Sequence, residues 1–336
     1  MQETRERVLD ALTEGPVTGP ELAERLDVSR AAVWKHVEAL REDGFDIASG
    51  DEGYVLAAVP EFGGTAVEYG LDAPFDVEFH DSVPSTNARA RDLAAEGAAD
   101  VVVLADEQTG GRGRLDREWS SPSGGIWLSL LVRPDVPPAH APVFTLAAAV
   151  AVTRAAREAG VDARIKWPND VVVSGASDSP AERPADDVAP PGEDAEGDEV
   201  ERKLAGVLTE MEGEADRVSW VVVGTGINAN VDPDDLPSEA RPATLLAEVG
   251  TVDRRLFTQR VLEEFDELRR ELESVIPAWR EHATTLGKRV RVDTPGGEVV
   301  GDAVDVEFPG TLVVDTGDER VRVTAGDCEH LRPIVD

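Results

Sequence analysis

The sequence predicts a multidomain α+β protein. It is expected to have an N-terminal winged helix-turn-helix, a central α+β domain with a mixed or antiparallel sheet, and a small SH3-like β-barrel at the C-terminus. Three observations favour this organisation. The 336 residues exceed what one compact core usually holds. Amphipathic helical patterns near the N-terminus give way to short alternating strands near the C-terminus. Segments rich in proline, glycine or acidic residues interrupt these patterns.

The first part, residues 1–57, predicts three short helices followed by a β-hairpin, which is the order of a winged helix-turn-helix. Thr18 and Glu21 are spaced as a capping box at the start of the second helix. Ser29 caps the third helix, whose apolar residues recur at i, i+4 and i+7 as a buried stripe. The expected helices and hairpin strands cover residues 4–13, 18–26, 28–41, 45–48 and 54–56.

Residues 58–77, with several glycines and prolines, predict a linker. In residues 78–284, strands follow strands with few βαβ alternations, which indicates a mixed or antiparallel sheet. The strands are expected at 101–106, 126–132, 171–173, 203–211 and 219–224, and the helices at 85–96, 142–160 and 253–274. Residues 174–202 hold ten acids and four prolines and predict a disordered loop between two strands. The alternating strands of 285–336 predict the β-barrel.

The formal net charge is −35, and only four of the 33 basic residues are lysines: Lys35, Lys166, Lys203 and Lys288. This composition favours an origin in a halophile, because molar salt screens surface charge within about 3 Å; an ordinary acidic protein is the alternative. One cysteine and five scattered histidines predict neither a disulfide nor a metal site built from side chains. The apolar stretch Val143–Thr153 is too short for a membrane span and the N-terminus lacks an apolar signal region, so we expect a cytoplasmic protein without membrane contact.

The sharpest motif is Gln108-Thr-Gly-Gly-Arg-Gly-Arg114, directly after a predicted strand. Its glycines expose backbone N–H groups to an anion, and Arg112 and Arg114 add forked donors for a phosphate or carboxylate. A flexible surface loop is the alternative. The motif lacks the GK[ST] of a P-loop and the GxGxxG of a Rossmann fold, which makes the usual nucleotide-binding folds poor candidates.

Four further motifs have structural alternatives of their own. Lys166-Trp-Pro-Asn-Asp170 presents Asn169 and Asp170 together at a strand end, or forms a simple turn. Lys203-Leu-Ala-Gly206 opens the next strand, where the glycine permits close approach of a ligand or of another backbone. Gly224-Thr-Gly-Ile-Asn228 closes a strand on a side chain that can hydrogen-bond a ligand. Ser85-Thr-Asn87 is equally explained as a helix cap.

Taken together and in this order, the five motifs closely resemble the catalytic domain of biotin–protein ligases, over residues 80–336. Residues 1–57 extend the resemblance to the bifunctional members that also repress the biotin operon. The resemblance implies catalytic roles for Lys203, Arg112, Arg114 and Asp170. It implies ATP contacts for Arg117, Lys166 and Asn228, and DNA contacts for Ser29, Arg30, Ala31 and Lys35. The implied biotin-binding residues are Ser85, Thr86, Asn87, Gln108, Gly111, Arg112, Gly113, Arg114 and Lys203.

The implied chemistry is attack of the biotin carboxylate on ATP, then transfer of biotin to a lysine of a biotin carboxyl carrier protein. Mg²⁺ and cationic side chains would neutralise the charge, and no side-chain nucleophile is needed. A homodimer that binds operator DNA is also implied. Three alternatives remain: a lipoate-type ligase, a transcription factor that only senses biotin, and a ligase whose N-terminal domain no longer binds DNA. Residues 1–57 carry six basic and thirteen acidic residues, although the third helix is locally positive.

Overall fold

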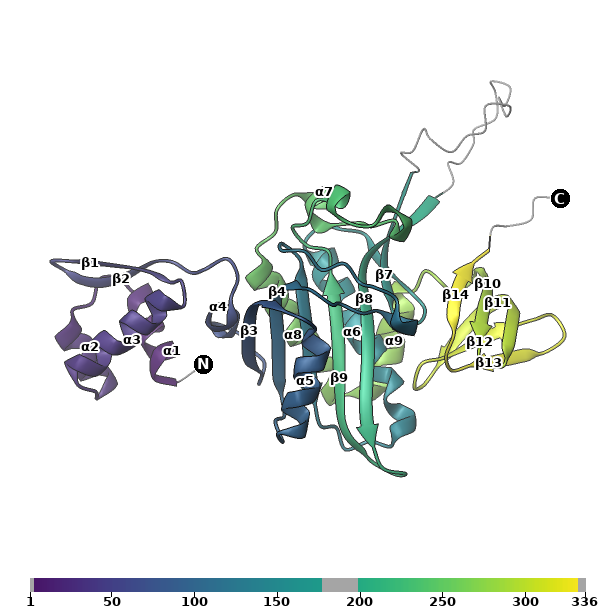
Figure 1. The fold of residues 1–336 in the computed structure, drawn as a ribbon, viewed down its shortest axis with the longest axis horizontal. Coiled ribbons are helices and arrows are strands. Elements are labelled where there is room, and N and C mark those ends of the chain that lie inside the picture. Colours follow the sequence, from purple (N-terminus) through teal and green to yellow (C-terminus); the bar gives the residue numbers. More distant parts are fainter. Residues whose placement is uncertain (1–2, 177–198, 332–336) are drawn as a thin grey trace, which may run out of the picture.

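The computed structural model describes residues 3–176 and 199–331, and it arranges them as three bodies in a row (Figure 1). The helical N-terminal domain lies at one end and the small C-terminal β domain at the other. The large sheet domain lies between them. This is the predicted fold class, and the positions of the three bodies decide which segments can meet at a site.

The N-terminal domain has the predicted order of three helices and a hairpin. Its elements are α1 (Glu3–Thr13), α2 (Gly19–Leu26), α3 (Arg30–Glu42), β1 (Asp46–Gly50) and β2 (Gly53–Ala58). The Thr18 side chain accepts from the Glu21 backbone N–H, and the Glu21 carboxylate accepts from Thr18 N at 3.0 Å, so the capping box is present. Val33, Val37 and Leu40 of α3 are buried as the periodicity predicts.

The predicted linker 58–77 is not a simple linker. It contains the short helix α4 (Gly64–Glu68), and its last residues begin a strand, β3 (Asp76–Val83). Ala66 is buried in the core of the N-terminal domain, whereas Val67 is buried in the core of the central domain. Gln259 Nε2 donates to the carbonyls of Val67 and Tyr69, both at 2.8 Å. The glycines and prolines that suggested flexibility therefore flank a packed connector.

The central domain is built on one mixed sheet with strand order β3-β4-β5-β9-β8-β7-β6. Only the β3–β4 pair is parallel within the described sheet; the other neighbours run antiparallel. Helices α6, α8 and α9 share the main core on one face, and α5 packs on the other. Beyond β3, the elements are β4 (Val101–Gln108), β5 (Ile126–Val132), β6 (Ala163–Lys166), β7 (Asp170–Ala176), β8 (Glu199–Gly213), β9 (Val218–Ile227), α5 (Thr86–Ala95), α6 (Pro142–Glu158), α7 (Leu245–Val249), α8 (Arg254–Arg270) and α9 (Leu272–His282).

Several predicted boundaries in this domain are wrong. The helix expected at 253–274 is two helices, α8 and α9, which meet at Glu271. The prediction of an acidic loop at 174–202 is wrong at both ends, because 174–176 continue β7 and 199–202 begin β8. The β7–β8 ladder continues to the register pair Ala176↔Glu199. Its main-chain hydrogen bonds form although these residues lack the large apolar side chains by which the strands were predicted. Residues 177–198 of that prediction lie outside the described residues.

One helical stretch, Pro138–Glu158, is long and apolar enough to cross a membrane by length and composition. Within the protein, 72% of its apolar window is buried, and α6 packs against α8, α9 and the central sheet. Its apolar residues are therefore accounted for by the core of the domain.

The C-terminal domain is a small antiparallel sheet with strand order β13-β12-β11-β10-β14. The strands are β10 (Arg289–Thr294), β11 (Gly297–Glu307), β12 (Thr311–Asp315), β13 (Arg320–Val323) and β14 (Asp327–His330). Two hydrogen bonds from Trp167 attach this domain to the central one: Trp167 N donates to Thr285 Oγ1, and Trp167 Nε1 donates to Gly310 O, both at 2.9 Å.

Candidate active site

A cavity of about 1090 Å³ lies beside the central sheet, and all five sequence motifs contribute to it. It is bounded by the start of α5, the 108–120 loop, the ends of β8 and β9, and one residue of the C-terminal domain, Asp327. The ends of strands and the loops that follow them are common positions for ligand sites, because the rigid sheet holds the loops that carry the binding residues in place. The motif Lys166–Asp170 contributes only its last two residues, Asn169 and Asp170.

One end of the cavity is a buried polar network. Thr86 donates through its backbone N and its Oγ1 to Gln108 Oε1, at 2.8 and 3.0 Å. Ser129 Oγ donates to Thr86 Oγ1 at 2.8 Å and lies 2.6 Å from Asn87 Oδ1. Gln108 Nε2 donates to Ser121 Oγ at 3.0 Å. Buried polar groups held in this way cannot relax, so they present fixed donors and acceptors to a neutral polar ligand.

Asn87 owes its position to the neighbouring strand. Its Nδ2 donates to Glu210 Oε2 at 2.8 Å, and Glu210 also pairs with Arg91 at 2.7 Å. A Cβ added at Gly224 would lie 2.0 Å from Asn87 Oδ1, so only glycine fits there. The motif Ser85–Asn87 has two roles. Ser85 caps helix α5, with its Oγ accepting from Ala88 N at 3.3 Å, and the three residues of the motif line the cavity.

The arginines of the 108–117 loop have different surroundings. Arg114 donates to Asn169 Oδ1 at 2.9 Å and to Gly326 O at 2.6 Å, and Arg117 pairs with Asp327 at 2.6 Å. Arg112 is mostly exposed and pairs with Asp116 at 3.2 Å. The loop is thus attached to the C-terminal domain, and its three guanidinium groups line the cavity. Gly111 lies behind that lining, where its carbonyl accepts from Trp119 N at 3.0 Å.

At the middle of the cavity Lys203 Nζ lies 2.7 Å from Asp170 Oδ1 and 5.0 Å from the centre of the Trp119 ring. Asp170 Oδ1 is buried, and the Lys203 ammonium is its partner. Two other buried atoms of the cavity residues, Trp119 Nε1 and Asn228 Oδ1, have no partner within the described residues. Unpaired buried polar atoms are costly, and a ligand that pairs them removes that cost.

Trp119 is a site residue that the sequence analysis missed. Its ring lies on the glycine backbone of β8 and β9, since a Cβ at Gly226 would approach Trp119 Nε1 to 2.5 Å and one at Gly206 would contact the ring at 3.2 Å. Two motif glycines thus make room for the indole. The sequence feature that could have indicated Trp119 is the presence of Gly206 and Gly226, two strand glycines that leave room for a large side chain.

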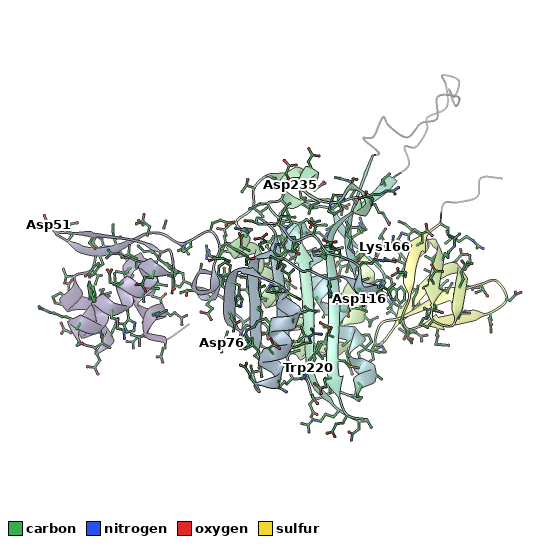
Figure 2. All side chains as sticks on the ribbon, viewed as in Figure 1. Asp51, Asp76, Asp116, Lys166, Trp220 and Asp235 are labelled. Carbon is green, nitrogen blue, oxygen red and sulfur yellow. The ribbon has the colours of Figure 1, made fainter. Side chains whose placement is uncertain are left out.

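Lys166 was predicted to contact ATP, and the structure does not bring it to the cavity. Its Nζ faces Glu201 Oε2 at 3.7 Å, near the C-terminal domain (Figure 2). Side chains alternate along β6, and the buried Trp167 at its end packs into the interdomain contact. Glu201 also accepts from Lys288 Nζ and contacts His330 Nδ1, each at 2.8 Å. Burial would raise the pKa of Glu201, but these two hydrogen bonds outweigh it and hold the pKa at about 2.

Side-chain metal sites and covalent catalysis find no support in the described part of the chain. Residues 3–176 and 199–331 hold no group of three or more His, Cys, Asp or Glu side chains that could bind a metal ion. Cys328 is largely buried in the C-terminal domain, and burial raises the pKa of its thiol to about 12. A thiol in that state is a packing residue and not a nucleophile.

The residues predicted to contact DNA lie on α3. Ser29 caps the helix, with its Oγ accepting from Ala32 N at 3.2 Å, and Arg30, Ala31 and Lys35 are exposed. Arg41, which adds to the positive charge of this helix, is turned toward the hairpin. Its Nε donates to Ile47 O at 3.1 Å, so its charge serves the fold.

Comparisons with known proteins agree across the chain. Models described as HTH domain, Biotin/lipoate A/B protein ligase family and Biotin protein ligase C terminal domain match residues 4–55, 79–228 and 285–331. The bifunctional ligase/repressor BirA of Bacillus subtilis is 33% identical over 329 residues, 93% of each chain. The biotin–(acetyl-CoA-carboxylase) ligase of Mycobacterium tuberculosis is 34% identical over 74% of this chain and 86% of its own.

Solved structures are similar in fold. The biotin protein ligase from Aquifex aeolicus in complex with biotin and ATP superposes with a TM-score of 0.58 at 24% identity, covering 76% of this chain and 99% of that one. Its apo structure gives a TM-score of 0.55 at 20% identity, with 76% and 99% covered. At these identities the structures establish the shared fold.

Proposed function

Because the chain belongs to the biotin protein ligase family, in the form that carries an N-terminal helix-turn-helix domain, we propose how its own residues perform ligation. Biotin and ATP would bind in the 1090 Å³ cavity and react to biotinyl-5′-adenylate and pyrophosphate. The carrier lysine would then attack the acyl carbon, and AMP would leave. One observation carries this proposal: a hydrogen-bonded polar network and a group of cationic side chains line a single cavity.

The neutral network suits the uncharged head of biotin. Thr86, Gln108 and Ser129 hold each other by hydrogen bonds, with Thr86 and Ser129 buried and Gln108 half-buried, so they are pre-organised for a ureido ring, which both donates and accepts. Ser85 and Asn87 complete this wall. Gly111, Gly113 and the two arginines of the loop would enclose the biotin tail and the phosphate of the adenylate.

The cationic part suits the reacting groups. In the first step a carboxylate oxygen attacks the α-phosphorus, and the transition state concentrates negative charge. Lys203 would bind the carboxylate and stabilise that charge, while Arg112 and Arg114 hold the phosphate. The Asp170 carboxylate, 2.7 Å from Lys203 Nζ, would help to orient the incoming carrier lysine. The lysine N forms the amide bond as the C–O bond to AMP breaks.

The nucleotide would lie beside Asn228. Its Nδ2 donates to Lys203 O at 3.2 Å and Ala243 O at 3.1 Å, which leaves Oδ1 as a buried acceptor without a partner. The adenine amino group is a donor and guanine has a carbonyl at that position, so this acceptor favours ATP over GTP. Arg117 would contact the phosphates after leaving Asp327.

Mg²⁺ fits this site only together with the substrate. Carboxylates line the cavity, among them Asp116, Glu118 and Asp170, and Mg²⁺ is commonly held by one or two carboxylates plus substrate phosphates. When bound it would neutralise phosphate charge. The residues of this chain would hold the biotin carboxylate and the phosphate in place.

The test of the ligase proposal is ATP-dependent labelling of a biotin carboxyl carrier domain in molar KCl, with lipoate as the competing acid. Lys203→Ala should lower pyrophosphate release at least about a hundredfold, the scale of losing one charge-stabilising donor. Lys35→Ala, which removes an exposed ammonium on α3 outside the cavity, is the control. Near-normal pyrophosphate release by Lys203→Ala, or labelling with lipoate in place of biotin, would contradict the proposal.

We further propose that the protein is a cytoplasmic, biotin-responsive repressor that binds operator DNA as a homodimer. Exposed Arg30, Ala31 and Lys35 on α3 support a major-groove reader. The net charge of −35 with four lysines supports adaptation to high salt. In about molar KCl, anisotropy titrations with DNA upstream of the organism's biotin genes should show binding that needs biotin and ATP together. Arg30→Ala combined with Lys35→Ala should abolish it. Absence of sequence-specific binding under all ligand conditions would contradict the repressor and leave the ligase unaffected.

A further inference from the structure

The exposed face of α3 carries a large apolar side chain that ligation does not use. Trp34 is 58% exposed, and it is the one large apolar side chain of the described N-terminal domain with high exposure. Arg30, one helical turn before Trp34, and Lys35, the residue after it, are also exposed, whereas Val33 and Val37 of the same helix are buried. The indole of Trp34 is thus an apolar group that a partner of this helix can cover, and it lies next to two exposed basic side chains.

The charges around Trp34 favour a polyanionic partner. Arg30 and Lys35 form no ion pair with any described residue, whereas Arg41 is committed to the hairpin. The tip of that hairpin carries Asp51 and Glu52, and Asp51 lies at the outer end of the domain (Figure 2). The wing is therefore poorly suited to phosphates, and contacts with a polyanion must concentrate on the Arg30–Lys35 face.

Salt decides what kind of contact is useful there. Contacts to phosphate gain affinity by releasing counterions, and this gain falls steeply as salt rises. For a protein with net charge −35, the acidic surface repels DNA in dilute salt, and in molar salt counterion release contributes little affinity. Apolar contact with a base edge does not depend on counterions, and the C5-methyl group of thymine is the apolar feature of the major groove.

We propose that Trp34 is a specificity-determining residue that packs its indole against a thymine C5-methyl group in the major groove, with Arg30 and Lys35 as flanking phosphate or base contacts. This inference rests on the proposed DNA binding and deepens it. It predicts that affinity depends on one or more methyl groups and that Trp34 adds affinity without adding salt dependence.

The experiment uses the full-length protein with saturating biotin and ATP, and the upstream duplex made with thymidine or with deoxyuridine, which lacks only the methyl group. The wild type should bind the thymidine duplex several-fold more tightly. Trp34→Ala should weaken binding about tenfold, the scale of one good base contact, and bind both duplexes equally. Its slope of log affinity against log salt should equal that of the wild type, whereas Lys35→Ala should flatten the slope. Trp34→Phe should retain part of the preference.

Leu256→Ala is the matched control, because Leu256 is 52% exposed on α8, outside the proposed surface. Ligase activity and melting temperature verify the folding of each variant. Wild-type affinity for Trp34→Ala overturns the Trp34 inference alone, and so does a normal preference for thymidine. Loss of DNA binding accompanied by loss of the ligand-induced dimer would assign Trp34 to self-association instead. If the wild type binds no DNA, both the repressor proposal and the Trp34 inference fail.

Discussion

Ala66 and Val67 are consecutive residues of α4, yet their side chains are buried in two different hydrophobic cores. The connector between the N-terminal and central domains is therefore packed on both sides. A few residues upstream, Glu61 pairs with Arg254 at 2.8 Å, and Arg254 pairs with Asp106 of β4 at 2.6 Å. Asp106 is two residues before Gln108 of the cavity, so a charged bridge joins the connector to the strand that leads into the site.

Arg254→Ala should loosen this connector. Hydrogen bonds to charged groups contribute about 1.5–3 kcal/mol each, so losing them should raise local opening about tenfold or more. The backbone amides of Val67 and Tyr69, which donate to Gly63 O and Thr65 O, should exchange with deuterium correspondingly faster. Arg260→Ala on the same helix, which pairs with Glu158, is the control. Equal exchange in wild type and Arg254→Ala would show that α4 is held by its apolar contacts alone.

Arg114→Gly should release biotinyl-adenylate. Arg114 joins the 108–117 loop to Asn169 and Gly326, so its loss removes two attachments of the loop and leaves the Arg117–Asp327 pair. If this loop covers the adenylate and excludes water, the variant should label nearby lysines indiscriminately when carrier is scarce. Mass spectrometry of a mixture of carrier and unrelated protein measures that selectivity. Arg114→Lys, which keeps the charge, should leak less, and strict carrier selectivity in the glycine variant would disprove the covering role.

Residues 177–198 should be dispensable. The register pair Ala176↔Glu199 ends the β7–β8 ladder, so a short Gly/Ser turn can join the two strands. Replacing the segment should leave the melting temperature and the ligation rate close to those of the wild type. Calorimetry and carrier labelling in the same high-salt buffer measure both quantities. A large loss of either would mean that the segment packs against the protein or takes part in turnover.

Most of the residues that the sequence motifs single out line the cavity, because glycine and polar motifs reflect local structural requirements. Gly224 is needed for the approach of Asn87, and the Thr86–Gln108 contact joins two motifs at the end of β4. Both constraints appear in the sequence as short patterns. The order of the domains was equally accessible, since the capping box of α2 and the buried stripe of α3 are local signals.

The remaining features depend on tertiary contacts. Lys166 shares a motif with Asp170, but it faces Glu201 at the interdomain contact, and spacing along the chain does not reveal that. Trp119 belongs to the site because Gly206 and Gly226 leave room for its ring. The connector helix α4 is five residues long, too short for a periodic pattern. Strand β3 has a largely polar sequence, and its pairing with β4 comes from sheet assembly.

The stabilising contribution of Glu201 should be lost in acid. The pKa of Glu201 is lowered from 4.5 to about 2 despite burial, because His330 and Lys288 hydrogen-bond its carboxylate. A carboxylate with a lowered pKa adds stability above its unfolded pKa, and that stability is lost as the pH falls from about 4.5 toward 2. At about 1.4 kcal/mol per pKa unit the contribution is at most about 3 kcal/mol.

Glu201→Gln should therefore lower the free energy of unfolding near pH 7 and flatten its dependence on pH between 5 and 2, measured by urea titration at fixed salt. Because Glu201 of β8 meets Lys288 and His330 of the C-terminal domain, the loss should appear as earlier separation of the two domains. Glu307→Gln is the control, since Glu307 pairs with Arg322 on the surface, where such a pair contributes little. If both variants keep the wild-type pH profile, the Glu201 cluster does not hold the domains together.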